Sequence, residues 1–321
     1  MTVLILAHDS DTVAEVVQGE LEARGVTVMK VNPSGFPARI SIGAFLDGTS
    51  PWSGLLTDHG GPSVELRDIT AVWQRRPSQF VMDERMSPAE RAFAYGEARR
   101  GFGGVLAGLS GCLWVNDPMA AARAEYKPIQ LAIATEVGLR VPRTLITSEP
   151  HTAYDWAEDL TRPVVYKPMS GVYHADEGER RVMFTSLVDD LDDLLDPAFA
   201  RTAQMLQERI PKAFEARVCI FGTQIFAVRI DAASEQARKD WRSDYDALTY
   251  SVIELPEELT RSLRELLMKL GLVAGMVDLI CTPSGCWVFL EVNQGGEFGW
   301  LAEATGLPMY AAMADLLEKG T

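Results

Sequence analysis

The chain has 321 residues, a hydrophobic fraction of 47% and a formal net charge of −15. This length exceeds what one hydrophobic core usually holds, so we expect two or three lobes. The acidic balance argues against a nucleic-acid backbone as partner, because phosphate binding there requires a basic surface. It does not exclude a nucleotide, whose phosphates need only a local group of lysines and arginines.

Neither a secretory signal nor a membrane span is expected. The apolar run at residues 3–7 is too short for a signal peptide, and no basic residue precedes it. No stretch of about 20 apolar residues is present. Cys112, Cys219, Cys281 and Cys286 form no CxxC motif, which predicts reduced core thiols in a cytoplasmic protein. A Cys281–Cys286 bridge across one hairpin is the alternative.

The first third of the chain alternates between strand and helix patterns. Residues 2–7 predict a strand, residues 11–24 a helix and residues 26–29 a second strand. Residues 71–77 predict a strand end that carries two arginines, residues 88–109 a helix and residues 111–117 a further strand. This order is typical of a parallel α/β lobe with right-handed crossovers, and we place its end near residues 118–125.

The remainder of the chain predicts α+β structure. A helix is expected at 125–139, followed by strands at 141–147, at 162–167 before a glycine-containing loop, and at 181–187. Leucines at helical spacing predict a helix over 187–196, whose aspartates form a solvated face rather than an acidic metal site. From residue 203 the pattern is antiparallel, with a hairpin turn near 222, a helix at 256–270, a hairpin at 276–293 and a closing helix at 308–318.

The 276–293 hairpin brings two carboxylates together. A two-residue turn at Ser284-Gly285, or a symmetric four-residue loop, places Asp278 directly opposite Glu291, with Asn293 on the same face. Opposed Cβ atoms lie about 5 Å apart, where like charges destabilise a sheet, so an oxygen-bound cation such as Mg²⁺ is indicated. We prefer this to solvated carboxylates because the expected neighbours on that face are apolar, namely Ile280, Phe289 and Trp287. A slip of one residue would separate the two acids.

Cations that could meet phosphate lie elsewhere in the chain, which contains no GxxxxGK[ST] motif. Lys167 ends an apolar strand directly before a glycine-containing loop, whose N–H groups could cover phosphates, and Lys127 lies near the start of the 125–139 helix. Each lysine alone would be read as a surface residue, but both occur with the acid pair. Arg217, Arg229 and Arg242 could neutralise a transferring phosphoryl group, and ordinary ion pairing is the alternative, chiefly for Arg229.

A connecting segment could bind a nucleotide base. The residues QERIP, 207–211, follow an apolar strand and precede a new β element. Their backbone could pair with a purine edge, and Glu215 could reach ribose hydroxyls.

Taken in order, these motifs resemble the ATP-grasp superfamily. The matching pieces are Lys127 before a helix, VVYKP with its glycine loop, LQERI, EARVCIFG and DLICTPSGCWVFLEVN, which span about residues 120–321. Within the superfamily the chain resembles the graspetide synthetases, which mature microviridin-type peptides, through VWQRRP, KPIQLAIATEVGLRVPRT, DWRSDYDALTY and EVNQGGEFGWL. The resemblance implies an ATP-grasp fold with a Rossmann-like pre-ATP-grasp lobe at 1–120, a central lobe at 121–205 and a C-terminal lobe at 206–321.

The resemblance also implies a role for each candidate residue. It puts Lys127 and Lys167 on the nucleotide phosphates, the adenine hinge at Gln207, Glu208 and Ile210, Glu215 near ribose, Arg217 and Arg242 near the transferred phosphate, and Mg²⁺ on Asp278, Glu291 and Asn293. Three positions depart from the family pattern. Pro211 lacks an N–H for adenine, and Gln294 and Glu297 stand where the family more often has a proline and a glutamine.

The implied activity is that of an ADP-forming ligase that uses ATP and Mg²⁺. It would activate Asp or Glu side chains of a ribosomal precursor peptide, made of leader and core, as acyl phosphates. Ser or Thr hydroxyls, or Lys amines, would then form ω-esters or ω-amides.

Two other functions stay open, namely a ligase that adds an amino acid to a peptide or protein carboxylate and a regulatory protein that binds MgATP without chemistry. No nucleic acid or membrane partner is expected, and a homodimer is compatible with the sequence. By family analogy the leader would bind at residues 229–250 or 187–196.

Overall fold

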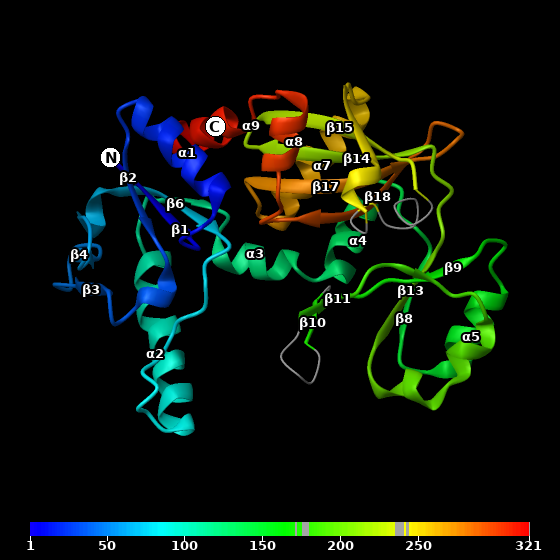
Figure 1. Ribbon diagram of the computed structural model, residues 1–321, viewed down its shortest axis with the longest axis horizontal. Helices are drawn as coiled ribbons and strands as arrows, with labels where there is room; N and C mark the ends of the chain where they lie inside the picture. Colours follow the sequence, from blue (N-terminus) through cyan, green and yellow to red (C-terminus); the bar gives the residue numbers. More distant parts are fainter. Residues whose placement is uncertain (171, 175–179, 235–240, 242–243, 321) are drawn as a thin grey trace.

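The computed structural model describes residues 1–170, 172–174, 180–234, 241 and 244–320. The N-terminal elements lie at one end of the molecule and a small central sheet lies at the other, with a five-stranded sheet above and between them (Figure 1). The fold is therefore a mixture of α/β and α+β structure, as the sequence predicts.

The N-terminal lobe is built on a parallel sheet in the order β2-β1-β6-β7. These strands are β1 (Thr2–Ala7), β2 (Thr27–Val31), β6 (Ile69–Arg75) and β7 (Leu113–Val115). Helix α1 (Thr12–Ala23) is capped by Asp11, whose side chain accepts the Ala14 N–H. Helix α2 (Pro88–Ala107) is preceded by Ser87, which forms a capping box with Glu90. The strand and helix alternation predicted for this lobe is confirmed.

A second small sheet in this lobe was not predicted from the sequence. It contains the antiparallel strands β3 (Ile40–Phe45), β4 (Ser53–Asp58) and β5 (Ser63–Glu65), flanked by the short 3₁₀ turns η1 (Pro33–Gly35) and η2 (Leu66–Asp68). Ile40 and Leu56 are fully buried and attach this sheet to the core of the lobe.

Two helices, α3 (Pro118–Ala124) and α4 (Lys127–Glu136), lead to the central sheet, whose order is β12-β9-β13-β8. Its strands are β8 (Thr144–Thr147), β9 (Val164–Tyr166), β12 (Ser186–Leu187) and β13 (Gln204–Glu208), and helix α5 (Pro150–Glu158) packs against it. A separate short hairpin is formed by β10 (Val172–His174) and β11 (Arg180–Val182). The single strand predicted at 181–187 is therefore two short strands.

The prediction of a helix at 187–196 is wrong. The structure has the 3₁₀ turn η3 (Leu191–Leu195), followed by a second one, η4 (Pro197–Arg201). The Asp190 side chain accepts the Asp192 N–H and the Asp196 side chain accepts the Ala198 N–H. Such local side-chain bonds compete with helical backbone bonds, and they break the segment into two capped turns. Of the four leucines in this segment, only Leu194 is buried.

The C-terminal sheet is antiparallel, in the order β16-β15-β14-β17-β18. Its strands are β14 (Phe214–Phe221), β15 (Gln224–Ala232), β16 (Leu248–Ile253), β17 (Ala274–Cys281) and β18 (Trp287–Asn293), with the 3₁₀ turn η6 (Tyr245–Ala247) before β16. Helix α7 (Glu257–Leu270) covers one face with a stripe of buried leucines at 259, 263, 266, 267 and 270. Gly271, with φ +75°, ends this helix.

The other face of this sheet joins the N-terminal lobe through α8 (Gly299–Thr305) and α9 (Met309–Lys319). Val13 and Val17 of α1 share one core with Met309 and Met313 of α9 and with Cys219 of the sheet. Helices α1 and α9 therefore lie side by side (Figure 1), and the segment after β18 is held close to the end of β6.

The proposed division at 120 and 205 stays a prediction, although two facts bear on it. The boundary between 205 and 206 falls within β13, and the shared core connects the first and third segments.

In the part of the chain that the structure describes, no helix combines the length and apolar character needed to cross a membrane. All four cysteines are free thiols, so the Cys281–Cys286 bridge is not formed. Burial raises the pKa of the Cys219 thiol to about 12 and that of Cys112 to about 11.

We expect iodoacetamide at about pH 8 to alkylate Cys286 in the native protein and Cys219 only after denaturation, because the thiolate is the nucleophile and a raised pKa keeps Cys219 protonated. Cys286 is partly exposed, whereas Cys219 is fully buried. Peptide mass spectrometry with and without urea measures the order of labelling. Native labelling of Cys219 as fast as that of Cys286 would contradict the buried environment.

Candidate active site

A cavity of about 710 Å³ lies where the central and C-terminal sheets meet. Residues of β9, of β13 and its following segment, of β14 and of the β17–β18 hairpin contribute to its lining. Among them are seven residues singled out from the sequence: Lys167, Gln207, Glu208, Ile210, Glu215, Asp278 and Glu291. Side chains separated by long stretches of chain therefore converge on one cavity.

The hairpin places Asp278 opposite Glu291, as predicted, but its turn length and its register near the turn differ from the prediction. The turn contains three residues, Pro283 to Gly285, and Gly285 has φ +78° while its N–H donates to the Thr282 carbonyl at 2.9 Å. A three-residue loop shifts the pairing by one residue relative to the predicted turns. A bulge between Asp278 and Leu279 shifts it back and leaves Leu290 without an opposed residue on β17.

The bulge also changes which apolar side chains accompany the two carboxylates. Phe289 and Trp287 pack on the opposite face, with Val277 and the leucines of α7, so their predicted place beside the acids is wrong. Ile280 and Leu290 line the cavity instead. The carboxylates therefore still have apolar neighbours, but from the bulged stretch of β18 and from β17.

Glu291 forms ion pairs with both candidate phosphate-binding lysines. Its side chain is 4% exposed, and its Oε2 lies 2.5 Å from Lys127 Nζ and 3.1 Å from Lys167 Nζ. Lys127 is supplied by the start of α4, and Lys167 directly follows β9, where its N–H donates to the Met205 carbonyl at 3.0 Å. Two cations on one buried carboxylate provide excess positive charge beside the cavity.

Asp278 is paired with the arginine directly across the neighbouring strand. Arg217 Nη1 donates to both carboxylate oxygens, at 2.8 and 3.1 Å, and Asn293 Nδ2 donates to Oδ2 at 3.2 Å. Burial alone would lower the pKa of the Arg217 guanidinium, but the Asp278 carboxylate beside it raises the pKa above its ordinary value. Arg217 therefore stays charged. Its guanidinium also lies 5.7 Å from the Trp241 ring centre.

The expected nucleotide hinge lines the cavity through Gln207, Glu208 and Ile210. Gln207 is buried and donates to Thr144 Oγ1 at 3.0 Å, and Glu208 accepts from Arg162 at 2.7 Å. Glu215, farther along, is paired with Lys212 at 2.9 Å.

Other candidate residues have different positions. Arg242 lies outside the described residues, as does part of the 229–250 segment considered for leader binding. Arg229 forms a bidentate pair with Asp231, at 2.6 Å for each bond, and its guanidinium lies 4.2 Å from the Phe214 ring. For Arg229, ordinary strand ion pairing is therefore the observed arrangement.

The donor chemistry fits Mg²⁺, although the set differs from an acidic cluster. Among the described residues, no group of three or more His, Cys, Asp and Glu side chains could hold a metal ion. The candidate site instead combines the carboxylates of Asp278 and Glu291 with the amide oxygen of Asn293, all hard oxygen donors. Rotating the Asn293 amide by half a turn would direct Oδ1 toward the carboxylates.

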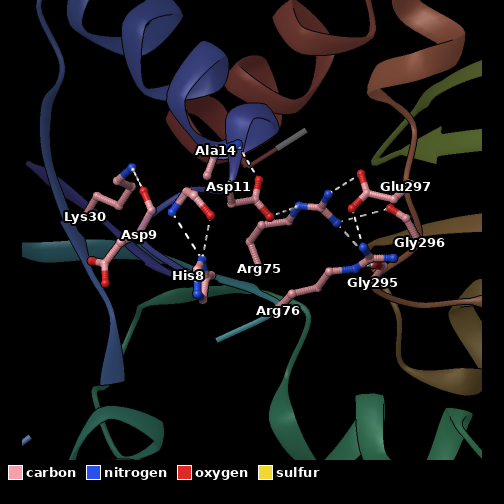
Figure 2. A network of polar contacts seen from close by, with 11 residues as sticks. His8, Asp9, Asp11, Ala14, Lys30, Arg75, Arg76, Gly295, Gly296 and Glu297 are labelled. Carbon is pink, nitrogen blue, oxygen red and sulfur yellow. Dashed lines mark hydrogen bonds and ion pairs between the residues drawn. The ribbon is translucent and has the colours of Figure 1, made fainter. Parts of the chain in front are cut away.

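Sequence reasoning noted the two arginines at the end of the 71–77 strand and Glu297 but missed that they hold the segment after β18. Arg75, at the end of β6, is 2% exposed and contacts the Glu297 carboxylate together with Arg76 (Figure 2). Asn116, which directly follows β7, donates to the Gln294 carbonyl at 3.0 Å. One signal could have identified them, because ligand sites of parallel sheets lie beyond the carboxyl ends of the strands. Strand β6 ends in Arg75, and Asn116 directly follows β7.

Comparison with known proteins agrees with this architecture. Residues 2–123 match the family model of the MvdD pre-ATP grasp domain. No curated protein matches the chain. The solved structure of macrocyclase MdnC from Microcystis aeruginosa MRC, bound with precursor peptide MdnA, is similar at 30% identity and a TM-score of 0.85, over 99% of this chain and 99% of that one.

Two further structures are similar over nearly the whole chain. A RiPP-associated ATP-grasp ligase of Chryseobacterium gregarium, in complex with ADP and a leader and core peptide, has 28% identity and a TM-score of 0.90, covering 100% of this chain and 97% of its own. Macrocyclase MdnB from Microcystis aeruginosa MRC has 28% identity and a TM-score of 0.80, covering 99% of both chains. Because similarity to MdnC extends from end to end, the chain belongs to the graspetide synthetase family of ATP-grasp ligases.

Proposed function

We propose that this protein is an ATP- and Mg²⁺-dependent macrocyclase of a ribosomal precursor peptide in the cytoplasm. It links Asp or Glu side chains of the peptide to Ser or Thr hydroxyls as ω-esters, or to Lys amines as ω-amides. The observation that carries the proposal is the opposed pair Asp278 and Glu291 beside the cavity, with Lys127, Lys167 and Arg217 bonded to them.

The reaction has two balanced steps. A peptide carboxylate oxygen attacks the γ-phosphorus of ATP, and the bond to ADP breaks, which gives an acyl phosphate. The hydroxyl or amine then attacks the acyl carbon, phosphate leaves and the proton passes to solvent. The peptide loses one water for each link, while ATP becomes ADP and phosphate.

Each charged group of the site is assigned a role in this two-step reaction. Lys127 and Lys167 bind the nucleotide phosphates, and Arg217 neutralises charge on the transferring group. Asp278, Glu291 and Asn293 would hold Mg²⁺, which when bound stabilises charge on phosphate oxygens. The hinge Gln207–Ile210 binds adenine, Glu215 binds ribose, and Arg242 is assigned to the acyl phosphate from the family pattern.

The peptide partner is supported by the relatives. The MdnC structure holds a precursor peptide, and the Chryseobacterium ligase holds a leader and core peptide with ADP. Because both reacting groups belong to one bound chain, positioning should account for much of the rate. A homodimer is part of the proposal and is tested by the mass of the protein in solution.

Incubation of the protein with MgATP and the precursor encoded beside its gene should remove one water per link from the peptide. Mass spectrometry measures this loss, and mild base separates ω-esters, which it cleaves, from ω-amides. A control peptide with its acidic core residues changed to amides should stay unmodified. A gain equal to one amino-acid residue, which is the amino acid less one water, would indicate the alternative ligase. ATP turnover without any change in peptide mass would contradict cross-linking.

A further inference from the structure

The segment Gln294–Glu297, which we call the post-ligand loop, follows the metal candidate Asn293. Each of its four backbone carbonyls accepts a hydrogen bond from a side chain: Gln294 O from Asn116 at 3.0 Å, Gly295 O from Arg75 and Arg76 at 3.2 and 3.3 Å, Gly296 O from Arg75 at 3.4 Å, and Glu297 O from Arg217 at 3.2 Å. Side chains therefore satisfy all four carbonyls of this loop and restrain its backbone.

Most of these donors belong to the N-terminal lobe rather than to the sheet that carries the loop. Arg75 and Arg76 lie at the carboxyl end of β6, and Asn116 lies at the end of β7. Figure 2 shows both arginines directed at the loop, with the Glu297 side chain returning to meet them. Arg75 also lies 3.3 Å from the Asp11 carboxylate at the start of α1.

Charge in this cluster is balanced within the protein. Arg75 and Arg76 carry two positive charges, and Asp11 and Glu297 carry two negative ones. The cluster therefore does not need an external anion. Its organisation suits a structural clamp on the loop better than a separate binding site.

The clamp connects directly to the candidate metal ligands. Arg217, which donates to Glu297 O, donates through its other terminal nitrogen to the Asp278 carboxylate. The Gly296 N–H donates to the Asn293 carbonyl at 3.3 Å. Gly296 is also tightly packed, since a Cβ there would lie 2.7 Å from Arg217 Nη2 and 3.1 Å from Asn293 Cβ. A shift of the loop would therefore move Arg217 or Asn293.

We propose that Arg75, Arg76 and Glu297 are positioning residues through which the N-terminal lobe orients the Mg²⁺ ligands. The inference rests on the metal site of the proposed function. Outer residues that orient metal ligands typically change metal affinity or activity about 10- to 100-fold when mutated. The clamp matches that arrangement, because it contacts the loop and Arg217 rather than the carboxylates of Asp278 and Glu291.

The test compares Glu297→Ala and Arg76→Ala with Arg24→Gln. Arg24 joins the same two parts of the chain, through Asp315 at 2.8 Å and Glu318 at 3.2 Å, but makes no contact with the loop. Calorimetry would measure binding of MgADP and of ADP in EDTA, and electron paramagnetic resonance would measure Mn²⁺ bound with ADP. These readouts need no peptide and no turnover.

We expect Glu297→Ala and Arg76→Ala to weaken Mn²⁺ and MgADP binding about 10-fold, with ADP binding in EDTA changed less than about 2-fold. Glu297→Gln keeps a hydrogen-bond acceptor and should restore most of the affinity. Arg24→Gln should lower Tm without changing metal binding.

Metal affinities of Glu297→Ala and Arg76→Ala equal to that of Arg24→Gln would overturn the inference. The result is separable from the proposed function. If no precursor is cross-linked and yet the clamp variants lose metal affinity, the macrocyclase assignment fails and the positioning role stands. If the precursor is cross-linked and the clamp variants keep the parent's metal affinity, the macrocyclase assignment stands and the positioning role fails.

Discussion

Asp278→Asn should lower kcat for peptide cross-linking by on the order of 10²–10³-fold, because it removes a charged oxygen donor from the proposed Mg²⁺ site. The substitution keeps the shape of the side chain and one acceptor for Arg217, so the β14–β17 register should survive. The Arg217 and Asp278 side chains are 6% and 10% exposed, so the neutral amide leaves a buried guanidinium without its counter-charge. Loss of one partner of such a pair costs roughly 3–5 kcal/mol.

Stability and catalysis must therefore be separated in this experiment. Asp315→Asn is the matched control, since Asp315 is paired with Arg24 at 2.8 Å and does not line the cavity. It should reduce Tm modestly and leave kcat unchanged. Circular dichroism and MgADP binding of Asp278→Asn identify a folded but inactive protein. A folded Asp278→Asn enzyme with the parent rate would refute the assignment of Asp278 to Mg²⁺.

Elements with strong local patterns could be predicted from the sequence. Strand β1 is buried along its whole length, and α7 carries its leucines on one face, so each is visible within its own segment. The β3–β5 sheet has no such pattern, because its strands are largely half-exposed. Gly54 there has φ +128°, and a Cβ would lie 1.9 Å from the Gly43 carbonyl, a close backbone approach that only the fold reveals.

The carboxylate pair illustrates how a correct prediction can rest on an incorrect step. The three-residue turn and the bulge each shift the pairing by one residue, in opposite senses, so Asp278 still faces Glu291. No residue type in this hairpin marks the bulge. The sequence therefore predicts Phe289 and Trp287 on the wrong face of the sheet. The predicted pair is correct because these two shifts cancel, whereas Phe289 and Trp287, which lie between the bulge and the turn, are predicted on the wrong face.

Periodicity and motif patterns in the sequence do not predict contacts between lobes. Arg75 and Glu297 are separated by 222 positions, and the glutamate departs from the residue common in the family, so neither predicts the other. The phosphate-binding roles predicted for Lys127 and Lys167 come from the resemblance to the family and stay predictions. The convergence of the two lysines on a single oxygen of Glu291 follows only from the packing of α4 and β9 around β18.

The two lysines should act non-additively, since both hold Glu291 Oε2, at 2.5 and 3.1 Å. Under the proposed function, Lys127→Ala or Lys167→Ala would remove one charge-assisted contact to phosphate, worth about 1.5–3 kcal/mol, and should raise the KM for ATP about 10- to 100-fold. In either variant the remaining lysine still balances Glu291, so Tm should fall only slightly. The double variant leaves a carboxylate that is 4% exposed without either lysine.

For the double variant we therefore expect a loss of Tm larger than the two single losses combined, together with loss of turnover. Thermal unfolding and ATP binding of all four proteins complete the cycle. Lys30→Ala is the control, since Lys30 is paired with Glu15 at 3.3 Å in the N-terminal lobe and should change neither quantity appreciably. Additive losses in Tm would show that the lysines do not share Glu291. An unchanged KM for ATP in both single variants would remove them from the phosphate site, because a cation that balances only the protein's own carboxylate affects stability and not nucleotide affinity.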